Sequence, residues 1–353
     1  MKQSVLTMVA LVATLSIFTS CEKDEPITPA ADYSDILTNT GENVILKTYE
    51  DLANKTALLL TATQVLEANP TAANLEAAKT AWVSARSPWE QSEGFLFGPV
   101  DQEGLDPSLD SWPVNVIDLN NVLNSSNELT VAFLAQQEGT LKGFHTIEFL
   151  LWGESGNKQV GDFTTRQFEY LAAASGALAA DAQELYDLWK PSGGNFVSNV
   201  TNAGNGSQVY ISQKAALEEI TNALVIIADE VANGKINDPF AQQDLSLEES
   251  QFSNNSKADF ADNMRSIQNI YTGKFGSFGN GRSLSEIIAE KNSGLDAQVK
   301  SEIEAAIQSI TSIPGTFSDA VFNNATAVSN AQTKVRDLQA TLEEKVLPII
   351  SNL

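Results

Sequence analysis

The sequence predicts an all-α protein. From Tyr33 onward, apolar residues recur at helical spacing, and no segment shows the sustained alternation of apolar and polar residues that predicts strands. Pro, Gly and Asn separate these periodic segments, as they do at the ends of helices. The length of 353 residues fits one large or two ordinary domains, and a hydrophobic content of 42% is enough to form substantial cores.

Helix-breaking residues divide the first half of the chain. Asn69-Pro70 interrupts the first periodic run, and Gly94 ends the second. A loop rich in Asp, Gly and Pro is expected over 101–113. The helices expected in this half are 35–68, 71–93, 114–124, 127–137, one around His145 that Gly153 ends, and 163–189, which Pro191 stops. Together they form the expected N-terminal bundle, residues 33–192.

The second half repeats this pattern after a break. Residues 193–206 have little to bury, and we expect a linker or an exposed loop there. Residues 207–353 form the expected C-terminal bundle, in which 234–248 is irregular. Its helices are expected at 207–233, from Asn255 or Ser256 to Gly273, and at 283–292, 295–312 and 319–347. Gly-Phe loops at 94–98 and 273–279 each follow a helix, which hints at internal duplication.

Composition limits the classes of partner. The formal net charge is −24, which argues against nucleic acid because phosphate binding needs a basic face. An acidic surface instead attracts cations weakly. The chain has one Cys, so an internal disulfide framework is excluded.

The N-terminus resembles a bacterial lipoprotein signal. Lys2 precedes a short apolar run, which is too short to span a membrane and ends in Phe18-Thr19-Ser20-Cys21. This ending resembles a lipobox, so residues 1–20 are the expected signal peptide and Cys21 the expected lipidation site. The alternative is a plain cleaved signal followed by a chance Cys.

The segment that follows is expected to tether the protein to the cell envelope. Residues 21–32 are charged and contain Pro, so we expect them to be flexible. Attached acyl chains would give stable membrane anchoring. Glu22 after the Cys resembles a signal for sorting to the outer membrane, with the protein facing either the periplasm or the cell surface.

His145 and Glu148 are the first candidate site. His145 is the only histidine, and Glu148 follows at i+3, where Cβ atoms on a helix lie roughly 5–6 Å apart. Apolar residues surround the pair, so the helix should be buried, and burial is costly unless both side chains find partners. The pair is either a metal or proton site or a structural hydrogen-bonded pair. Without HExxH or a second His, a zinc-protease site cannot be assembled from known spacings.

A second candidate site lies at the end of the 71–93 helix. Arg86, Glu90 and Glu93 share one helical face, with Trp82, Trp89 and Phe97 around them. The sequence fits an ordinary surface ion pair and the border of a pocket equally well.

The assembled motifs resemble the imelysin family of bacterial envelope proteins. The family motif GxHxxE appears as Gly143-Phe144-His145-Thr146-Ile147-Glu148, beside the Asp110-Ser111-Trp112-Pro113 loop and the segment from Ser250 to Gly273. Members are often lipoproteins, are classed with peptidases and are linked to iron uptake. The resemblance implies two related helical-bundle domains packed side by side, with the motif near their junction.

The resemblance also implies roles for individual residues. His145 and Glu148 are the metal-binding pair, or the catalytic pair if the protein is an enzyme. Glu93 and Asp110 would be additional metal ligands. The residues expected around the pocket are Trp82, Arg86, Trp89, Phe97, Trp112, Ser253, Asn263 and Tyr271.

Three functions follow from these residues. The first is an outer-membrane lipoprotein that binds a metal in iron acquisition, with other iron-uptake proteins as partners. A mixed nitrogen and oxygen site suits a divalent metal such as Fe, Zn, Cu or Mn. The second is a metallopeptidase, which needs three protein ligands, an open coordination position and a general base. The third is a module that binds an organic or protein ligand at the domain junction, without a metal.

Overall fold

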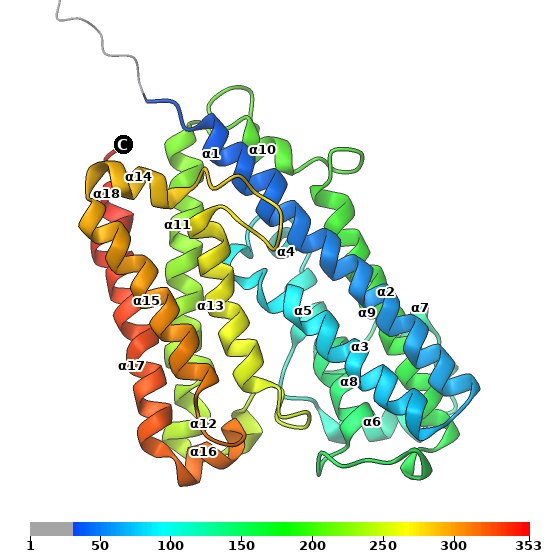
Figure 1. The fold of residues 1–353 in the computed structure, drawn as a ribbon. Helices are drawn as coiled ribbons and strands as arrows, with labels where there is room; N and C mark the ends of the chain where they lie inside the picture. The colour runs from blue at the N-terminus through cyan, green and yellow to red at the C-terminus, as the bar shows by residue number, and fades with distance from the viewer. Residues whose placement is uncertain (1–30) are drawn as a thin grey trace, which may run out of the picture. The chain divides into compact units, whose positions relative to one another are not determined.

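The computed structural model describes residues 31–353, in which Asp32–Leu353 form one compact unit. Helices and turns build this unit, and residues 31–353 contain no β-strand, which confirms the all-α prediction (Figure 1). None of the helices in this range is both long and apolar enough to cross a bilayer. The expected signal peptide, the lipidation site Cys21 and the tether up to residue 30 lie outside the described residues.

The first helices agree closely with the sequence pattern. The expected 35–68 helix is continuous, although part of it is π-helical. The elements of this half are α1 (Ser34–Thr38), the π-helix η1 (Asn39–Ile45), α2 (Leu46–Ala68), α3 (Ala72–Glu90), η2 (Glu93–Phe95), α4 (Pro99–Gln102), α5 (Leu105–Asp110), α6 (Val116–Leu123), α7 (Val131–Ala135), η3 (Gly139–Leu141), α8 (Gly143–Trp152), η4 (Val160–Asp162) and α9 (Thr165–Trp189).

The loop expected over 101–113 is largely helical. Pro99 begins α4, where its missing N–H costs nothing. Leu105 and Leu109, four residues apart on α5, are both buried. Tertiary burial of two leucines therefore outweighs the loop-forming composition of this segment.

The second half contains helices that the sequence pattern missed. Its elements are α10 (Val197–Thr201), α11 (Gln213–Asp229), the π-helix η5 (Glu230–Lys235), α12 (Asn237–Gln242), η6 (Leu245–Leu247), α13 (Ser256–Thr272), α14 (Leu284–Lys291), α15 (Ser293–Thr311), α16 (Phe317–Asn323), α17 (Ala325–Thr341), the π-helix η7 (Leu342–Val346) and α18 (Leu347–Ser351).

Three expectations need correction here. Residues 193–206 include α10, whose Val197 and Val200 are buried against Gly41 of η1, so this segment has more to bury than its composition suggests. Residues 234–248 include α12, which follows the buried Ile236. The expected 319–347 helix is interrupted at Asn324, whose φ of −134° is not helical.

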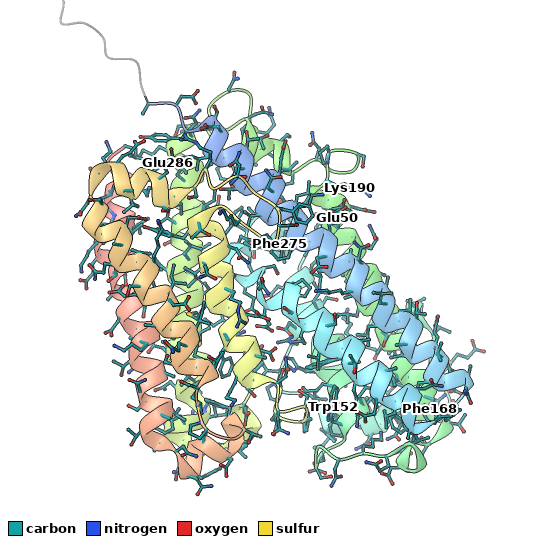
Figure 2. The ribbon with its side chains drawn as sticks, in the orientation of Figure 1. Glu50, Trp152, Phe168, Lys190, Phe275 and Glu286 are labelled. Carbon is teal, nitrogen blue, oxygen red and sulfur yellow. The ribbon has the colours of Figure 1, made fainter. Side chains whose placement is uncertain are left out.

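The helices pack in a pattern that brings distant segments together. Helix α2 lies along both α3 and α9, and α8 packs against the same two helices. Between α2 and α9, Tyr186 donates a hydrogen bond of 3.2 Å to Glu50, and Lys190 Nζ lies over the Tyr186 ring. Figure 2 shows Glu50 and Lys190 near each other. In the second half, α15 packs against α13 and α17, and α11 packs against α17.

One contact between the two halves of the chain matters most for the site. Helix α13 packs against α3 and η2. At Gly94 in η2, an added Cβ would lie only 2.5 Å from Ser266 Oγ of α13, so the close approach requires glycine. The acidic face of α3 therefore meets the polar side chains of α13.

Candidate metal centre

A close approach between two short helices positions His145. Gly143 begins α8 with φ of +74°, and a Cβ there would lie 2.9 Å from the carbonyl carbon of Leu109. Glycine alone fits this contact without strain. Because Asp110 follows Leu109 at the end of α5, the contact places the His145 ring beside the Asp110 carboxylate.

Both ring nitrogens of His145 face carboxylates. Nδ1 lies 3.2 Å from Glu148 Oε2, while Nε2 lies 3.1 Å from Asp110 Oδ1 and 3.8 Å from Glu249 Oε1. The residue is only 2% exposed. Burial by itself lowers the pKa of His145, but the Asp110 charge and the contacts with these carboxylates outweigh it and raise this pKa well above its ordinary value.

Glu148 is held in place from the other side. Its Oε1 accepts hydrogen bonds of 2.7 Å from both the backbone N–H and the hydroxyl of Ser253. The structure thus brings His145, Glu148 and Ser253 into contact. Glu148 faces Nδ1, whereas Asp110 and Glu249 face Nε2, so a role for Glu148 as a metal ligand stays a prediction.

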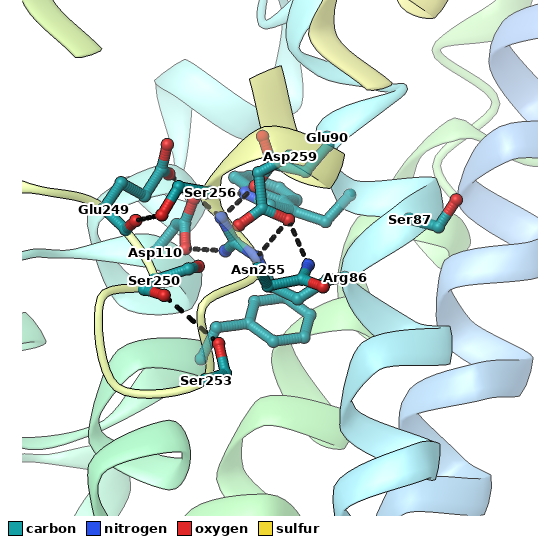
Figure 3. A network of polar contacts seen from close by, with 12 residues as sticks. Arg86, Ser87, Glu90, Asp110, Glu249, Ser250, Ser253, Asn255, Ser256 and Asp259 are labelled. Atoms are coloured by element: carbon teal, nitrogen blue, oxygen red, sulfur yellow. Dashed lines mark hydrogen bonds and ion pairs between the residues drawn. The ribbon is translucent and has the colours of Figure 1, made fainter. Parts of the chain in front are cut away.

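Arg86 lies at the centre of the polar cluster and is fully buried (Figure 3). Its guanidinium forms ion pairs with Asp110, Glu90 and Glu249, the last at 2.9 Å. The Arg86 Nε lies 3.6 Å from Asp259 Oδ1. The interpretation of Arg86 and Glu90 as an ordinary surface pair is therefore wrong, since neither side chain reaches solvent.

Lys235 brings a second buried cation to the cluster. Its Nζ lies 2.7 Å from Glu93 Oε2, 3.1 Å from Glu249 Oε2 and 3.5 Å from Glu90 Oε2. Burial lowers the pKa of Lys235, but these carboxylates raise it well above the ordinary value.

Neutral side chains orient the carboxylates. Asn263 on α13 donates hydrogen bonds of 2.7 Å to Glu90 Oε2 and to Glu93 Oε2. Trp89 donates a hydrogen bond of 2.6 Å from Nε1 to Asp110 Oδ2. These fixed donors hold the acidic groups in place before any ligand arrives.

The cluster contains more acid than base. Arg86, Lys235 and His145 are the basic groups that the salt bridges of the described residues bring to it. They face six buried carboxyl groups, those of Glu90, Glu93, Asp110, Glu148, Glu249 and Asp259.

The excess acid is reflected in the pKa values. Burial raises the pKa of Glu90 and Glu93 well above the ordinary value, and it raises the pKa of Asp259 to about 6. Burial also acts to raise the pKa of Asp110 and Glu249, but the nearby cations lower both. The site would therefore gain from a further cation.

Two groups of side chains have the spacing of metal ligands. Ligand atoms of Asp110, His145 and Glu249 lie within 4.8 Å of one another. The same holds for Glu90, Glu93, Asp110 and Glu249. His145 Nε2 points into these carboxylates, although its 3.1 Å contact with Asp110 Oδ1 lacks hydrogen-bond geometry. One imidazole nitrogen with carboxylate oxygens fits a divalent transition metal.

The family model for imelysin (peptidase M75) matches residues 45–345, which include the whole cluster. This chain belongs to the imelysin family. The match confirms the resemblance that the GxHxxE motif indicates.

Relatives support the same assignment. This chain is 31% identical over 313 residues to iron-regulated protein A of Synechococcus elongatus, covering 88% of this chain and 84% of that protein. It is also similar to the crystal structure of a candidate iron-regulated protein A precursor from Parabacteroides distasonis, with a TM-score of 0.81 and 25% identity over 91% of this chain and 94% of that one. An imelysin-like protein from Psychrobacter arcticum shares the fold, with a TM-score of 0.74 and 15% identity over 90% and 95% of the two chains.

A pocket of about 230 Å³ reaches the cluster of this imelysin. Glu93 and Asp110 belong to both the cluster and the pocket wall, and Asp106, Glu230 and Trp112 line the same pocket. Burial raises the pKa of Asp106 to about 6. An acidic pocket that ends at the buried carboxylates gives a cation a route to them.

The expected pocket residues lie at different distances from the polar cluster around His145 and Arg86. Trp112 packs beside His145, with ring centroids 6.0 Å apart. Trp82 donates a hydrogen bond of 2.9 Å to the Phe144 carbonyl and so supports α8. Phe97 lines a neighbouring pocket of about 320 Å³ that also includes Glu93.

Tyr271 is not brought to the cluster. Its hydroxyl lies 3.1 Å from Asp296 of α15, between two helices of the second half.

Sequence reasoning did not select Glu249, Lys235 or Asp259 as site residues. Glu249 stands directly before the Ser250–Gly273 segment, so its position was a usable signal. Asp259 resembles an ordinary acidic residue in the first turn of a helix. Lys235 falls in a stretch that looks irregular, and no sequence pattern distinguishes it.

Proposed function

We propose that this imelysin-family protein binds a divalent metal ion, with His145, Asp110 and Glu249 as ligands. The observation that carries the proposal is the buried excess of carboxylates around a single imidazole, whose Nε2 faces the carboxylates of Asp110 and Glu249. Isolated buried charge is costly, so a site with this excess gains by taking up a cation.

The surrounding side chains suit metal binding. A hydrogen bond from Nδ1 to Glu148 would leave the Nε2 lone pair free for a metal, as carboxylate partners of ligating histidines commonly do. In this proposal Glu148 orients the ring and Ser253 orients Glu148. Trp89 holds the second Asp110 oxygen, which keeps Oδ1 directed at the site.

Arg86 contacts the same carboxylates that face Nε2, so a metal would bind beside a fixed positive charge. Its additional contacts with Glu90 and Asp259 would hold the guanidinium in place as the charge changes. Each carboxylate oxygen has enough lone pairs to accept a hydrogen bond from Arg86 and to bind a metal as well.

We further propose that the metal is iron and that the protein serves iron acquisition at the cell envelope. Two relatives carry names that describe them as iron-regulated protein A or its precursor. The lipobox-like sequence at Cys21 supports anchoring to the outer membrane, with other iron-uptake proteins as partners. We also infer that the two halves of the chain are related bundles that meet near the GxHxxE motif.

A direct measurement of metal binding tests the proposed site at His145, Asp110 and Glu249. We expect equilibrium dialysis of the purified protein against Fe²⁺ under anaerobic conditions, and against Zn²⁺, to give one bound ion per chain. His145→Ala and Asp110→Asn should lose it, whereas Asp319→Asn, which removes an exposed carboxylate far along the chain, should keep it. Unchanged binding in both site variants would contradict the proposal.

Two alternatives have specific support. The ion pairs of Arg86 and Lys235 already neutralise part of the acid, as expected of a structural network or of a site for an organic or protein ligand. The family model carries a peptidase name, which supports a metallopeptidase. A melting temperature that no metal alters would favour the structural network or the site for an organic or protein ligand. Metal-dependent cleavage of an unfolded test protein, lost in Glu148→Gln, would favour the metallopeptidase.

A further inference from the structure

A cation already occupies the all-carboxylate part of the cluster. The ligand atoms of Glu90, Glu93, Asp110 and Glu249 form a group with metal-ligand spacing. The Lys235 ammonium lies at 2.7 to 3.5 Å from three members of this group, namely Glu93, Glu249 and Glu90. These are distances at which a charged group interacts directly with its counter-ions.

The fold directs Lys235 into this position. Lys235 is the last residue of the π-helix η5, which continues α11, and its side chain is fully buried. π-Helical turns are rare and often occur at functional sites. The ammonium also lies 5.5 Å from the centre of the Trp112 ring, which favours a positive charge.

The Lys235 position adjoins the proposed metal position. Asp110 and Glu249 belong to both groups of ligand atoms. Sites that hold two metal ions share ligands between neighbouring positions in this way. Glu93 and Asp110 also line the acidic pocket, so an ion that diffuses in could reach either position.

Resting on the proposed function, we propose that Lys235 is a built-in cation that fills a second cation position and limits this site to one metal ion. Its charge repels a second divalent ion, and its ammonium occupies the oxygens that would bind it. An all-oxygen position suits a hard ion such as Mn²⁺ better than a soft one.

Counting bound ions tests this inference. We would dialyse the purified protein and its Lys235→Met variant against Mn²⁺ and measure manganese per chain by mass spectrometry. We expect one ion in the parent protein and two in Lys235→Met. The matched control is Lys300→Met, which removes a lysine 2.9 Å from the buried Asp296 carboxylate outside the cluster and should leave the count at one.

A second variant distinguishes a change in metal binding from misfolding of Lys235→Met. Lys235→Met with Glu93→Gln removes one basic and one acidic group together, so the excess of acidic over basic groups in the cluster is unchanged. This double variant loses a ligand of the second position and should bind one ion. If Lys235→Met alone is unstable without metal, Mn²⁺ should restore its folding, because the ion replaces the missing charge.

The outcomes separate the two proposals. A parent protein that binds neither Mn²⁺ here nor Fe²⁺ or Zn²⁺ in the dialysis described above would overturn the proposed function, and this inference with it. One ion in both the parent and Lys235→Met would overturn this inference alone. This inference would also fall, and the proposed function would stand, if Lys235→Met stayed unfolded with Mn²⁺ while the double variant folded.

Discussion

His145 depends on its neighbours for its charge and its orientation. Glu148, held by Ser253, contacts Nδ1, while Asp110 and Glu249 lie on the Nε2 side. The imidazole is therefore fixed between carboxylates, and these carboxylates hold its pKa well above the ordinary value.

This raised pKa predicts how stability depends on pH. A histidine whose folded-state pKa exceeds its unfolded value of about 6.5 contributes stability that is complete below that pH and lost as pH rises through the folded pKa. Ionisation of Glu90 and Glu93, whose pKa values burial raises, acts in the same direction. We expect the melting temperature of the metal-free protein to fall from neutral to alkaline pH.

Thermal melts between pH 6 and 10 measure this effect. The fall should be smaller in His145→Gln, which has no proton to lose, and smaller in the parent protein with bound metal. A melting temperature that rises with pH over this range would contradict the raised pKa values of His145, Glu90 and Glu93.

Arg86 should contribute far more to stability than a surface arginine. Removing one partner of a buried ion pair typically costs about 3–5 kcal/mol, because the other charges stay buried. We expect a loss of that order in Arg86→Leu by chemical denaturation. The control is Arg265→Ala, which breaks a pair with Asp262 at a side chain 38% exposed and should cost about 0–1 kcal/mol. Equal losses in the two variants would contradict the burial of the network.

At the scale of elements, the contact between α5 and α8 assembles the site. Helix α5 ends at Asp110 and α8 begins at Gly143, and the two lie backbone to backbone at Leu109. The His145 helix follows from its apolar sequence. Helix α5 does not, because its formation depends on burial of Leu105 and Leu109 against other helices.

Gly143→Ala should separate these helices. The new Cβ would meet the Leu109 carbonyl. The alanine would also have to keep the positive φ of Gly143, which costs an L residue roughly 1–2 kcal/mol. We expect weaker metal binding and a stability loss beyond the backbone term. Gly104→Ala is the matched control, because its φ of +64° is also positive but nothing lies within 4 Å of the added Cβ.

Denaturation and metal dialysis of both glycine variants check this prediction. Equal stability losses with full metal binding in each would show that the close approach does not hold the site together.

At the scale of the whole molecule, the cluster draws on segments far apart in the chain. Its members come from α3, η2, α5, α8, η5, the loop before α13 and α13 itself. Sequence reasoning selected His145, Glu148, Arg86, Glu93 and Asp110 because local spacing or the resemblance to the family marks them, and the structure places all five in or beside the cluster.

The rest of the site could not be predicted from local pattern. Glu249 lies 163 residues from its partner Arg86, and Lys235 lies 142 residues from Glu93. Their proximity results from packing of α13 against α3 and from the π-helical end of α11. Helical periodicity carries no information about such contacts, and neither residue belongs to the GxHxxE motif.

Thermal melting with and without metal tests the proposed metal site most directly. We would compare the purified protein, His145→Ala and Asp110→Asn without metal and with Fe²⁺, Zn²⁺, Cu²⁺ and Mn²⁺. A ligand at 100 times its dissociation constant stabilises the folded state by about 2.7 kcal/mol. We expect a rise in melting temperature in the parent protein that both variants lack. A rise that persists in both variants, or no rise with any metal, would contradict a metal centre at His145 and Asp110.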